Sequence, residues 1–206
     1  MNLSNELESN YKIISEDIKK RLSEYKAVHK NDYFYELCFC ICTPQSKARS
    51  ALAVQKILMN KDFKKNKFDP TDILNDQNHY IRFHNQKAKR LLLLRENWAE
   101  TEKLIHSKLS NVQKRNQLAE KILGIGMKES SHFLRNIGYP NLAILDRHIL
   151  KHLKNCGVIE EIPKTISKNK YLEIEQEFLL FSEKINIKLD ELDLLFWSEE
   201  AGEILK

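Results

Sequence analysis

Two glycines separated by a single residue, Gly124 and Gly126, interrupt the helical pattern of this 206-residue chain. Apolar residues recur at helical spacing on both sides, over 112–123 and over 127–137. A connection this short between two helices needs a backbone angle φ above zero, which glycine adopts at little cost. Most Gly-x-Gly pairs are only turns. The pair therefore predicts a helical hairpin, and the residues that follow must decide whether the hairpin carries chemistry.

Helical spacing of apolar residues dominates the rest of the chain, and the predicted fold class is all-α. Tyr33–Cys42 is apolar all round, as expected for a central buried helix. Ser46 is expected to cap the helix after it, and Gly138 to end the second arm of the hairpin. The predicted helices cover 7–25, 33–42, 47–59, 85–105, 112–123, 127–137, 145–153, 171–185 and 189–199.

Composition and charge set only broad limits. The net charge of +5 is compatible with binding to phosphates, and equally with an ordinary basic protein. No run approaches about 18 apolar residues, and the N-terminus lacks the apolar stretch of a signal peptide, so we expect a cytoplasmic protein that contacts no membrane. Cys38, Cys40, Cys42 and Cys156 do not have the spacing of a metal site. We expect buried free thiols, which suit a reducing compartment.

Lys128 lies in the first turn of the second arm of the hairpin. An amine must be neutral to attack an electrophile, whereas free lysine has a pKa of about 10.4. The positive end of a helix dipole and burial both disfavour the ammonium form. A lysine in the first turn of a helix is therefore suited to nucleophilic catalysis. The alternative is an ordinary solvated lysine.

Asp146 lies eighteen residues after Lys128 and follows the apolar run Leu142–Leu145. One interpretation is an aspartate that caps the helix after it. The other is a carboxylate that stabilises positive charge on a sugar and assists proton movement. Both can hold at once.

Longer stretches around these residues resemble the helix-hairpin-helix DNA glycosylases, and most closely the type 2 8-oxoguanine DNA glycosylases of archaea and some bacteria. The matching blocks extend over nearly the whole chain. They are Gly124–Gly138, Leu142–Leu150, Thr43–Ala48, Ile81–Phe83 with Asn85-x-Lys87-Ala88, and the C-terminal Trp197-Ser198-x-x-x-Gly202-x-x-x-Lys206.

The resemblance implies a two-domain α-helical fold with a cleft between the domains. One domain would take 1–30 plus 138–206, and the other 31–137, ending in the hairpin at about 112–137. It implies that Lys128 is the nucleophile and Schiff-base lysine and that Asp146 is the catalytic carboxylate. The implied activity is removal of 8-oxoguanine followed by β-elimination at the abasic sugar. The four-cysteine iron–sulfur loop of endonuclease III relatives is missing, and we expect no metal and no cofactor.

Further residues are candidates for contacts with DNA. A base must leave the duplex before its sugar can be attacked, and aromatic side chains can stack on it. Trp197 is one such platform and Phe83 another, although either residue can instead belong to the core. The resemblance makes Lys206 a contributor to distinguishing the lesion from guanine. Gln45 matches a loop residue near the opened duplex, or is simply a polar residue at a helix start. Arg82, Lys87, Arg147 and the backbone at Gly124 and Gly126 are candidate phosphate contacts, or part of a solvated charged face.

Two rival functions remain open at this point. The first is a glycosylase of the same fold that acts on another oxidised base. The second is a non-catalytic helix-hairpin-helix module that only grips DNA, which would need the glycines but not Lys128 with Asp146. The expected partners are double-stranded DNA containing 8-oxoguanine and abasic DNA, and the expected state is a monomer.

Overall fold

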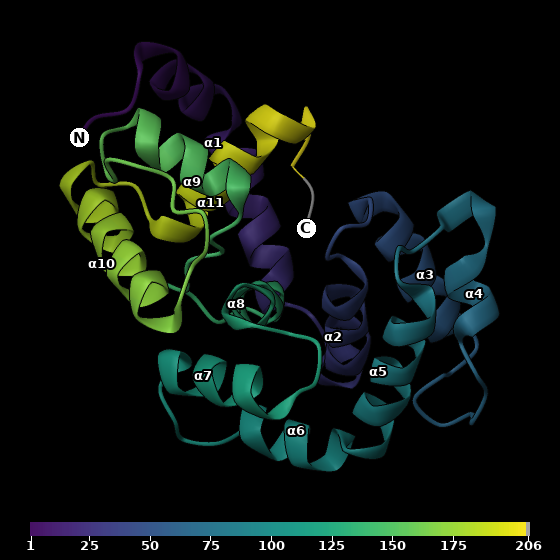
Figure 1. Cartoon of the computed structure of the whole chain (residues 1–206). Helices are drawn as coiled ribbons and strands as arrows, with labels where there is room; N and C mark the ends of the chain where they lie inside the picture. Colours follow the sequence, from purple (N-terminus) through teal and green to yellow (C-terminus); the bar gives the residue numbers. More distant parts are fainter. Residues whose placement is uncertain (205–206) are drawn as a thin grey trace. The chain divides into compact units, whose positions relative to one another are not determined.

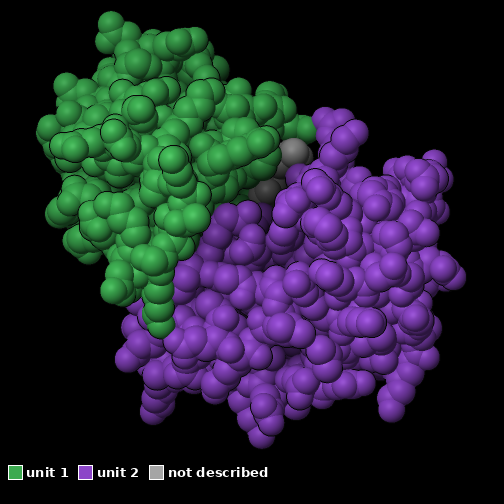
Figure 2. Space-filling model, in the orientation of Figure 1, with its two compact units in different colours: residues 1–27, 134–206 green, residues 28–133 purple. Residues whose placement is uncertain are grey.

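The computed structural model describes residues 1–204, and within them it contains helices and no strand (Figure 1). This confirms the all-α fold class. Leu205 and Lys206 lie outside the described residues. The chain forms two compact units: Met1–Ala27 with Leu134–Lys206, here called unit 1, and Val28–Phe133, called unit 2 (Figure 2). Whether these units are the domains expected from the sequence stays a prediction.

Unit 1 is built around a helix that is buried over most of its length. This helix, α11, packs against α1, α9 and α10, and eight consecutive residues from Leu189 to Phe196 are buried. One of these buried residues, Asp193, forms an ion pair with the buried Arg135, whose guanidinium is 2.5 Å from its carboxylate. The helices of the unit are α1 (Asn5–Lys26), α9 (Arg147–Asn155), α10 (Lys168–Lys184) and α11 (Leu189–Ala201).

Unit 2 has α2 (Tyr33–Cys42) at its centre, as the sequence predicts. Every residue of α2 after Tyr33 is buried, and the helix packs against α3 and α5. Cys38, Cys40 and Cys42 are free thiols within it, and Cys156 is a buried free thiol in unit 1. The other elements of unit 2 are η1 (Lys30–Asp32), α3 (Ala48–Asn60), α4 (Thr71–Asn75), η2 (Gln77–His79), α5 (His84–Glu96), α6 (Trp98–Ile105) and α7 (Asn111–Lys121). One further helix, α8 (Met127–Asn136), includes the boundary between the units.

The single long helix predicted over 85–105 is wrong, because α5 ends at Glu96 and α6 starts at Trp98. Asn97 separates them. Its side-chain amide donates to the carbonyl of Leu93 at 2.9 Å, and its backbone N–H donates to the same carbonyl at 3.1 Å. Asparagine side chains that bond the backbone in this way compete with regular helix formation.

Two predicted helix starts also need correction. The helix expected from Lys47 begins at Ala48, and Ser46 does not cap it; Lys47 occupies the cap position without a side-chain hydrogen bond. The helix expected from Leu145 begins at Arg147, because Asp146 caps it. Gly138 ends α8 as predicted. Its φ is +86°, its N–H bonds the carbonyl of Arg135, and the next N–H bonds the carbonyl of Leu134.

Candidate active site

The predicted hairpin is formed by α7 and α8 (Figure 1). A capping box starts α7, in which Ser110 and Gln113 each accept the other's backbone N–H. Gly124 has a φ of +98°, as the short connection requires. A Cβ atom at Gly124 would collide with the side chain of Arg90, whose Nε atom would be 2.5 Å away. Gly124 is therefore needed both for the turn and for the close approach of Arg90.

Gly126 has a different role from Gly124. Its φ is not positive, and a Cβ atom built on it would meet only the Glu129 carboxylate, at 3.7 Å, which is an ordinary contact. The residue is exposed and directly precedes α8. The backbone here is open to a ligand, next to the N–H groups that begin a helix.

Lys128 lies in the first turn of α8, with about a third of its side chain exposed (31%). Its Nζ atom is 3.1 Å from Oε1 of Glu129, and Oε2 of Glu129 accepts the backbone N–H of Gly126 at 3.4 Å. Glu129 thus links the hairpin backbone to the lysine. Glu129 is not among the site residues expected from the sequence, although an acidic residue three positions into a helix is a recognisable capping signal.

Asp146 is the N-cap of α9, as one of its two interpretations predicts. Its Oδ1 atom accepts the backbone N–H groups of His148 at 2.8 Å and Ile149 at 2.9 Å. Among residues 1–204, Oδ2 has no hydrogen-bond partner. The pKa of Asp193 is raised chiefly by burial, and the charge of Asp146 adds to that rise. The carboxylate of Asp146 is therefore fixed through one oxygen, while the other is available.

Trp197 is half-buried near the end of α11, and the ring of His148 stacks on it with centroids 5.8 Å apart and planes 21° apart. The Nδ1 atom of His148 is 3.0 Å from Glu200, and its Nε2 accepts from Arg147 at 3.2 Å. With Nε2 as the acceptor, Nδ1 carries the hydrogen and donates it in a hydrogen bond to the Glu200 carboxylate. Unit 1 therefore brings Asp146, Arg147, His148 and Trp197 together, and Glu200 secures the stack.

Gln45 and Phe83 share an unusual backbone. Their φ angles are +55° and +61°, in the left-handed region, and neither residue is a glycine. Both are exposed, Phe83 by 45%. Core packing, one of the two interpretations of Phe83, is therefore excluded. The guanidinium of Arg82 lies over the Phe83 ring, 4.9 Å from its centroid. Non-glycine residues in this conformation are held by their surroundings and are frequent at functional sites.

The predicted contact between Lys87 and a phosphate requires an ammonium group at the surface, and Lys87 is buried. The residue is 1% exposed, and its ammonium donates to the carbonyls of Cys42 and Pro44 and to the hydroxyl of Ser46. This position argues against a contact between Lys87 and DNA. Arg82 and Arg147, by contrast, are exposed. His132 is buried with its ring edge-on to Phe39, in keeping with a packing role.

Lys206 lies outside the described residues. The last residue that the structure describes, Ile204, is tied to unit 1, because its carbonyl accepts from the guanidinium of Arg21 at 3.4 Å. Ile204 and Glu203 line a shallow pocket with five residues of α1 that include Arg21.

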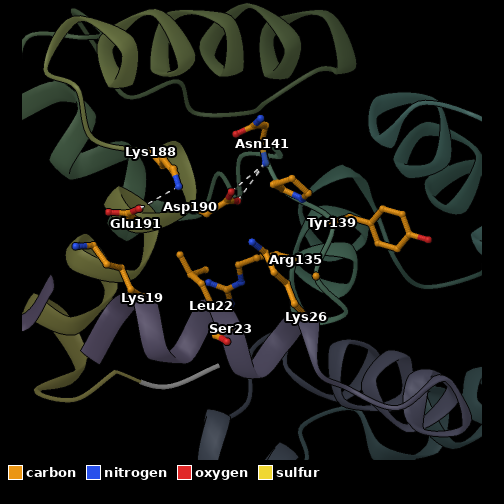
Figure 3. A pocket seen from close by; sticks show the side chains of 12 residues that line it. Lys19, Leu22, Ser23, Lys26, Arg135, Tyr139, Asn141, Lys188, Asp190 and Glu191 are labelled. Atoms are coloured by element: carbon orange, nitrogen blue, oxygen red, sulfur yellow. Dashed lines mark hydrogen bonds and ion pairs between the residues drawn. The ribbon is translucent and has the colours of Figure 1, made fainter. Parts of the chain in front are cut away.

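A pocket of about 500 Å³ opens elsewhere in unit 1 (Figure 3). Two lysines of α1 and Lys188, which directly precedes α11, line it, and the carboxylate of Asp190 accepts the backbone N–H of Asn141 within it at 3.1 Å. None of the site residues expected from the sequence lines this pocket. The candidate catalytic residues Lys128, in unit 2, and Asp146, in unit 1, therefore lie outside this pocket.

Residues 1–204 contain neither a metal-binding cluster nor a membrane-spanning helix. No three histidine, cysteine, aspartate or glutamate side chains within that range are grouped so that they could hold a metal ion. None of its helices is both long and apolar enough to cross a membrane.

Comparison with known proteins agrees with this arrangement. A family model described as 8-oxoguanine DNA glycosylase matches residues 18–187. A protein of Fusobacterium nucleatum named 8-oxoguanine DNA glycosylase/AP lyase is 41% identical, over 98% of this chain and 97% of its own length. A protein of the same name from Methanocaldococcus jannaschii is 38% identical, over 94% of this chain and 93% of its own.

Solved structures show the same likeness. The crystal structure of the Methanocaldococcus jannaschii 8-oxoguanine DNA glycosylase matches with a TM-score of 0.84 at 35% identity, covering 97% of this chain and 95% of that one. A structure of the glycosylase/lyase from this organism in complex with a 15mer DNA containing 8-oxoguanine matches with a TM-score of 0.83 at 37% identity, covering 94% and 93%. With a family model over most of its length and relatives above 30% identity over nearly all of it, this chain belongs to the 8-oxoguanine DNA glycosylase family.

Proposed function

We propose that this chain excises 8-oxoguanine from duplex DNA through a Schiff base on Lys128 and then cleaves the abasic strand by β-elimination. The observation that carries the proposal is the hairpin itself. Gly124 and Gly126 deliver an amine to the first turn of α8, beside backbone that is open to a ligand. A module that only grips DNA would need those glycines but not a lysine at that position. Relatives named glycosylase/AP lyase add weight to the catalytic reading.

Lys128 acts as the nucleophile. The ammonium first leaves Glu129 and loses its proton, and the neutral Nζ then attacks C1′ of the extruded nucleotide. The bond between C1′ and the base breaks, and the base leaves with that electron pair and takes up a proton. Nζ then loses a second proton, the bond between C1′ and O4′ breaks, and O4′ takes up a proton, which leaves an iminium between C1′ and Nζ. The iminium acidifies the C2′ proton, whose removal expels the 3′ phosphate, and water then releases the unsaturated aldehyde from Lys128.

Asp146 is the carboxylate that assists these steps. Two backbone N–H groups hold its Oδ1 and so fix its direction. The remaining oxygen is available to stabilise positive charge as the glycosidic bond breaks, and to carry protons between the steps. The capping role and the catalytic role thus use different oxygens of the same side chain.

Stacking holds the extruded base. Trp197 serves as the platform, since it is half-buried and its ring is already oriented by His148 two residues after Asp146. Phe83 offers a second exposed aromatic surface for a base. Lys206 distinguishes the lesion from guanine, and the bond from Arg21 to Ile204 supports this by securing the chain two residues earlier. Oxidation at C8 turns N7 of guanine into a donor, so an acceptor facing N7 binds the lesion and leaves guanine unpaired.

The remaining candidates contact the DNA backbone and the opened duplex. The N–H groups at Gly124 and Gly126 and the guanidinium groups of Arg82 and Arg147 bind phosphates. Gln45 enters the space that the base leaves. The enzyme acts as a monomer, needs no cofactor and works where chromosomal DNA is. Size-exclusion chromatography with and without a DNA duplex tests the monomer, and a dimer in both cases would contradict it.

Borohydride trapping on a duplex with one 8-oxoguanine tests the proposed function. The wild-type protein should give a covalent adduct and a nicked strand, and Lys128→Gln should give neither. Asp146→Asn should bind the duplex but excise slowly. Lys121→Gln, an exposed lysine at the end of α7, is the matched control and should behave as the wild type. An adduct that persists in Lys128→Gln would move the nucleophile elsewhere.

Competition between lesions tests the substrate. Duplexes with 8-oxoguanine should suppress trapping more strongly than duplexes with thymine glycol or uracil. Stronger competition by thymine glycol would favour the rival glycosylase for another oxidised base. Binding without any adduct or nick on all of these duplexes would favour the non-catalytic module.

A further inference from the structure

We infer that Lys87 is a positioning residue, whose buried ammonium fixes the loop between α2 and α3 and so holds Gln45 and Phe83 in place for DNA. This inference rests on the proposed function, in which these two residues meet the opened duplex. It also replaces the phosphate contact expected for Lys87 with a different role in the same reaction.

All three N–H donors of the Lys87 ammonium form hydrogen bonds to one short segment of the chain. It donates to the carbonyl of Pro44 at 2.6 Å, to that of Cys42 at 2.8 Å and to Oγ of Ser46 at 3.2 Å. A lysine ammonium has three N–H donors, and each of them binds one of these three residues. The three residues occupy every second position of the loop, so Gln45 lies between two of them. Burial of a charge is tolerated only with such full pairing. The loop between Cys42 and Lys47 therefore has one geometry that satisfies Lys87.

Lys87 is also connected by hydrogen bonds to the segment that contains Arg82 and Phe83. Ser46 Oγ, which accepts from the ammonium, also accepts the backbone N–H of Arg82 at 3.0 Å. The backbone N–H of Lys87 donates to the carbonyl of Phe83 at 3.0 Å. Gln45 and Phe83 thus belong to two segments, far apart in sequence, that are joined at Ser46 and at Lys87.

The backbone of both segments needs such restraint. Gln45 and Phe83 are non-glycine residues in the left-handed region, where a side chain is strained, and both are exposed. Exposed side chains gain little from core packing, so the strain must be balanced by bonds to the neighbouring backbone. The contacts of Lys87 and Ser46 supply those bonds. A preorganised loop loses less conformational freedom when DNA binds.

A purely structural lysine makes a different prediction from a positioning lysine. If Lys87 only stabilises the fold, its loss lowers every activity by the same factor. If it positions Gln45 and Phe83, its loss lowers excision from a duplex, which requires extrusion of a base, and spares cleavage at a preformed abasic site in single-stranded DNA. The ratio of these two activities separates the two roles.

Lys87→Met tests the inference, because methionine keeps an unbranched apolar chain and removes all three donors. Lys56→Met, an exposed lysine on α3, is the matched control. Hydrogen exchange should become faster at the amide of Thr43, which bonds the carbonyl of Phe39 at the end of α2, and at that of Ser46, which bonds the carbonyl of Thr43. Excision from the 8-oxoguanine duplex should fall roughly ten- to a hundredfold, with cleavage of the single-stranded abasic site changed less than about twofold.

Ser46→Ala is a second variant, which keeps the two carbonyl contacts of Lys87 and removes the junction to Arg82. It should give the same pattern with a smaller change, and it decides the question if Lys87→Met does not fold. Unchanged exchange at Thr43 and Ser46, or an equal fall in both activities, would overturn the positioning role. Failure of the wild-type protein to excise 8-oxoguanine would instead reject the proposed function. Hydrogen exchange in the loop does not depend on excision, so it tests the role of Lys87 separately.

Discussion

Glu129 lies beside Lys128 with one carboxylate oxygen 3.1 Å from Nζ, while its other oxygen accepts the N–H of Gly126. The amine must leave this ion pair before it can attack a sugar. Glu129→Gln keeps a group that can accept from Gly126 and removes the negative charge. We expect Schiff-base trapping on abasic DNA near neutral pH to become severalfold faster, measured by single-turnover borohydride trapping. Slower trapping would show that Glu129 assists the attack rather than restraining the lysine.

Gly124→Ala should be more damaging than the same change at another left-handed glycine. At Gly157, with φ of +70°, a Cβ atom would meet only ordinary contacts of 3.7 Å and more. Gly157→Ala should therefore cost about 1 kcal/mol of unfolding free energy from backbone strain. At Gly124 the collision with Arg90 adds to the strain, for a loss of roughly 2–3 kcal/mol and weaker DNA binding. Urea unfolding and DNA titration measure both. Equal losses of unfolding free energy for the two variants would contradict a collision between a Cβ atom at Gly124 and the Arg90 side chain.

Asp193→Asn should strongly destabilise the chain. The Arg135 and Asp193 side chains are 2% and 1% exposed and are 2.5 Å apart, so the substitution removes the carboxylate that the buried guanidinium contacts. Breaking such a pair costs roughly 3–5 kcal/mol. Removing the exposed pair of Lys170 and Glu173 with Lys170→Ala should cost less than about 1 kcal/mol. Urea unfolding of the two variants should show this contrast.

Lys87 should make the stability of the chain rise at alkaline pH. Burial lowers the pKa of its ammonium to about 8 from an ordinary 10.5. Between these values the folded chain holds fewer protons on Lys87 than the unfolded chain, so rising pH favours folding. Relative to Lys87→Met, the unfolding free energy of the wild type should rise between pH 8 and 10.5 by at most about 1.4 kcal/mol per pH unit. Below pH 8 the difference should stay constant. Parallel stability profiles of the two proteins across this range would contradict the lowered pKa.

The helices that the sequence predicts best are those in which one physical signal decides the outcome. Apolar residues on all sides make Tyr33–Cys42 a buried helix, and a glycine with a positive φ ends α8 at Gly138. The long helix over 85–105 was wrong because apolar spacing continues across Asn97, whereas the break comes from the hydrogen bonds of Asn97 to the Leu93 carbonyl. Periodicity carries no information about such a local competition.

The site was predictable where spacing along one helix or turn sets the geometry. The turn, the first-turn lysine and the capping aspartate follow from local pattern. The position of Lys87 did not, because its acceptors lie more than forty residues earlier and two of them are backbone carbonyls, which leave no trace in side-chain identity. The stack of His148 on Trp197 likewise depends on how α9 and α11 pack within unit 1.

The thiols of α2 have a consequence for a protein of this family. Peroxides react with thiolates, and burial raises the pKa of Cys38 well above its ordinary value and that of Cys42 to about 12. The same oxidants that convert guanine into 8-oxoguanine therefore find these sulfur atoms both un-ionised and inaccessible. Oxidation of these thiols is thus disfavoured twice, by their burial and by their protonation.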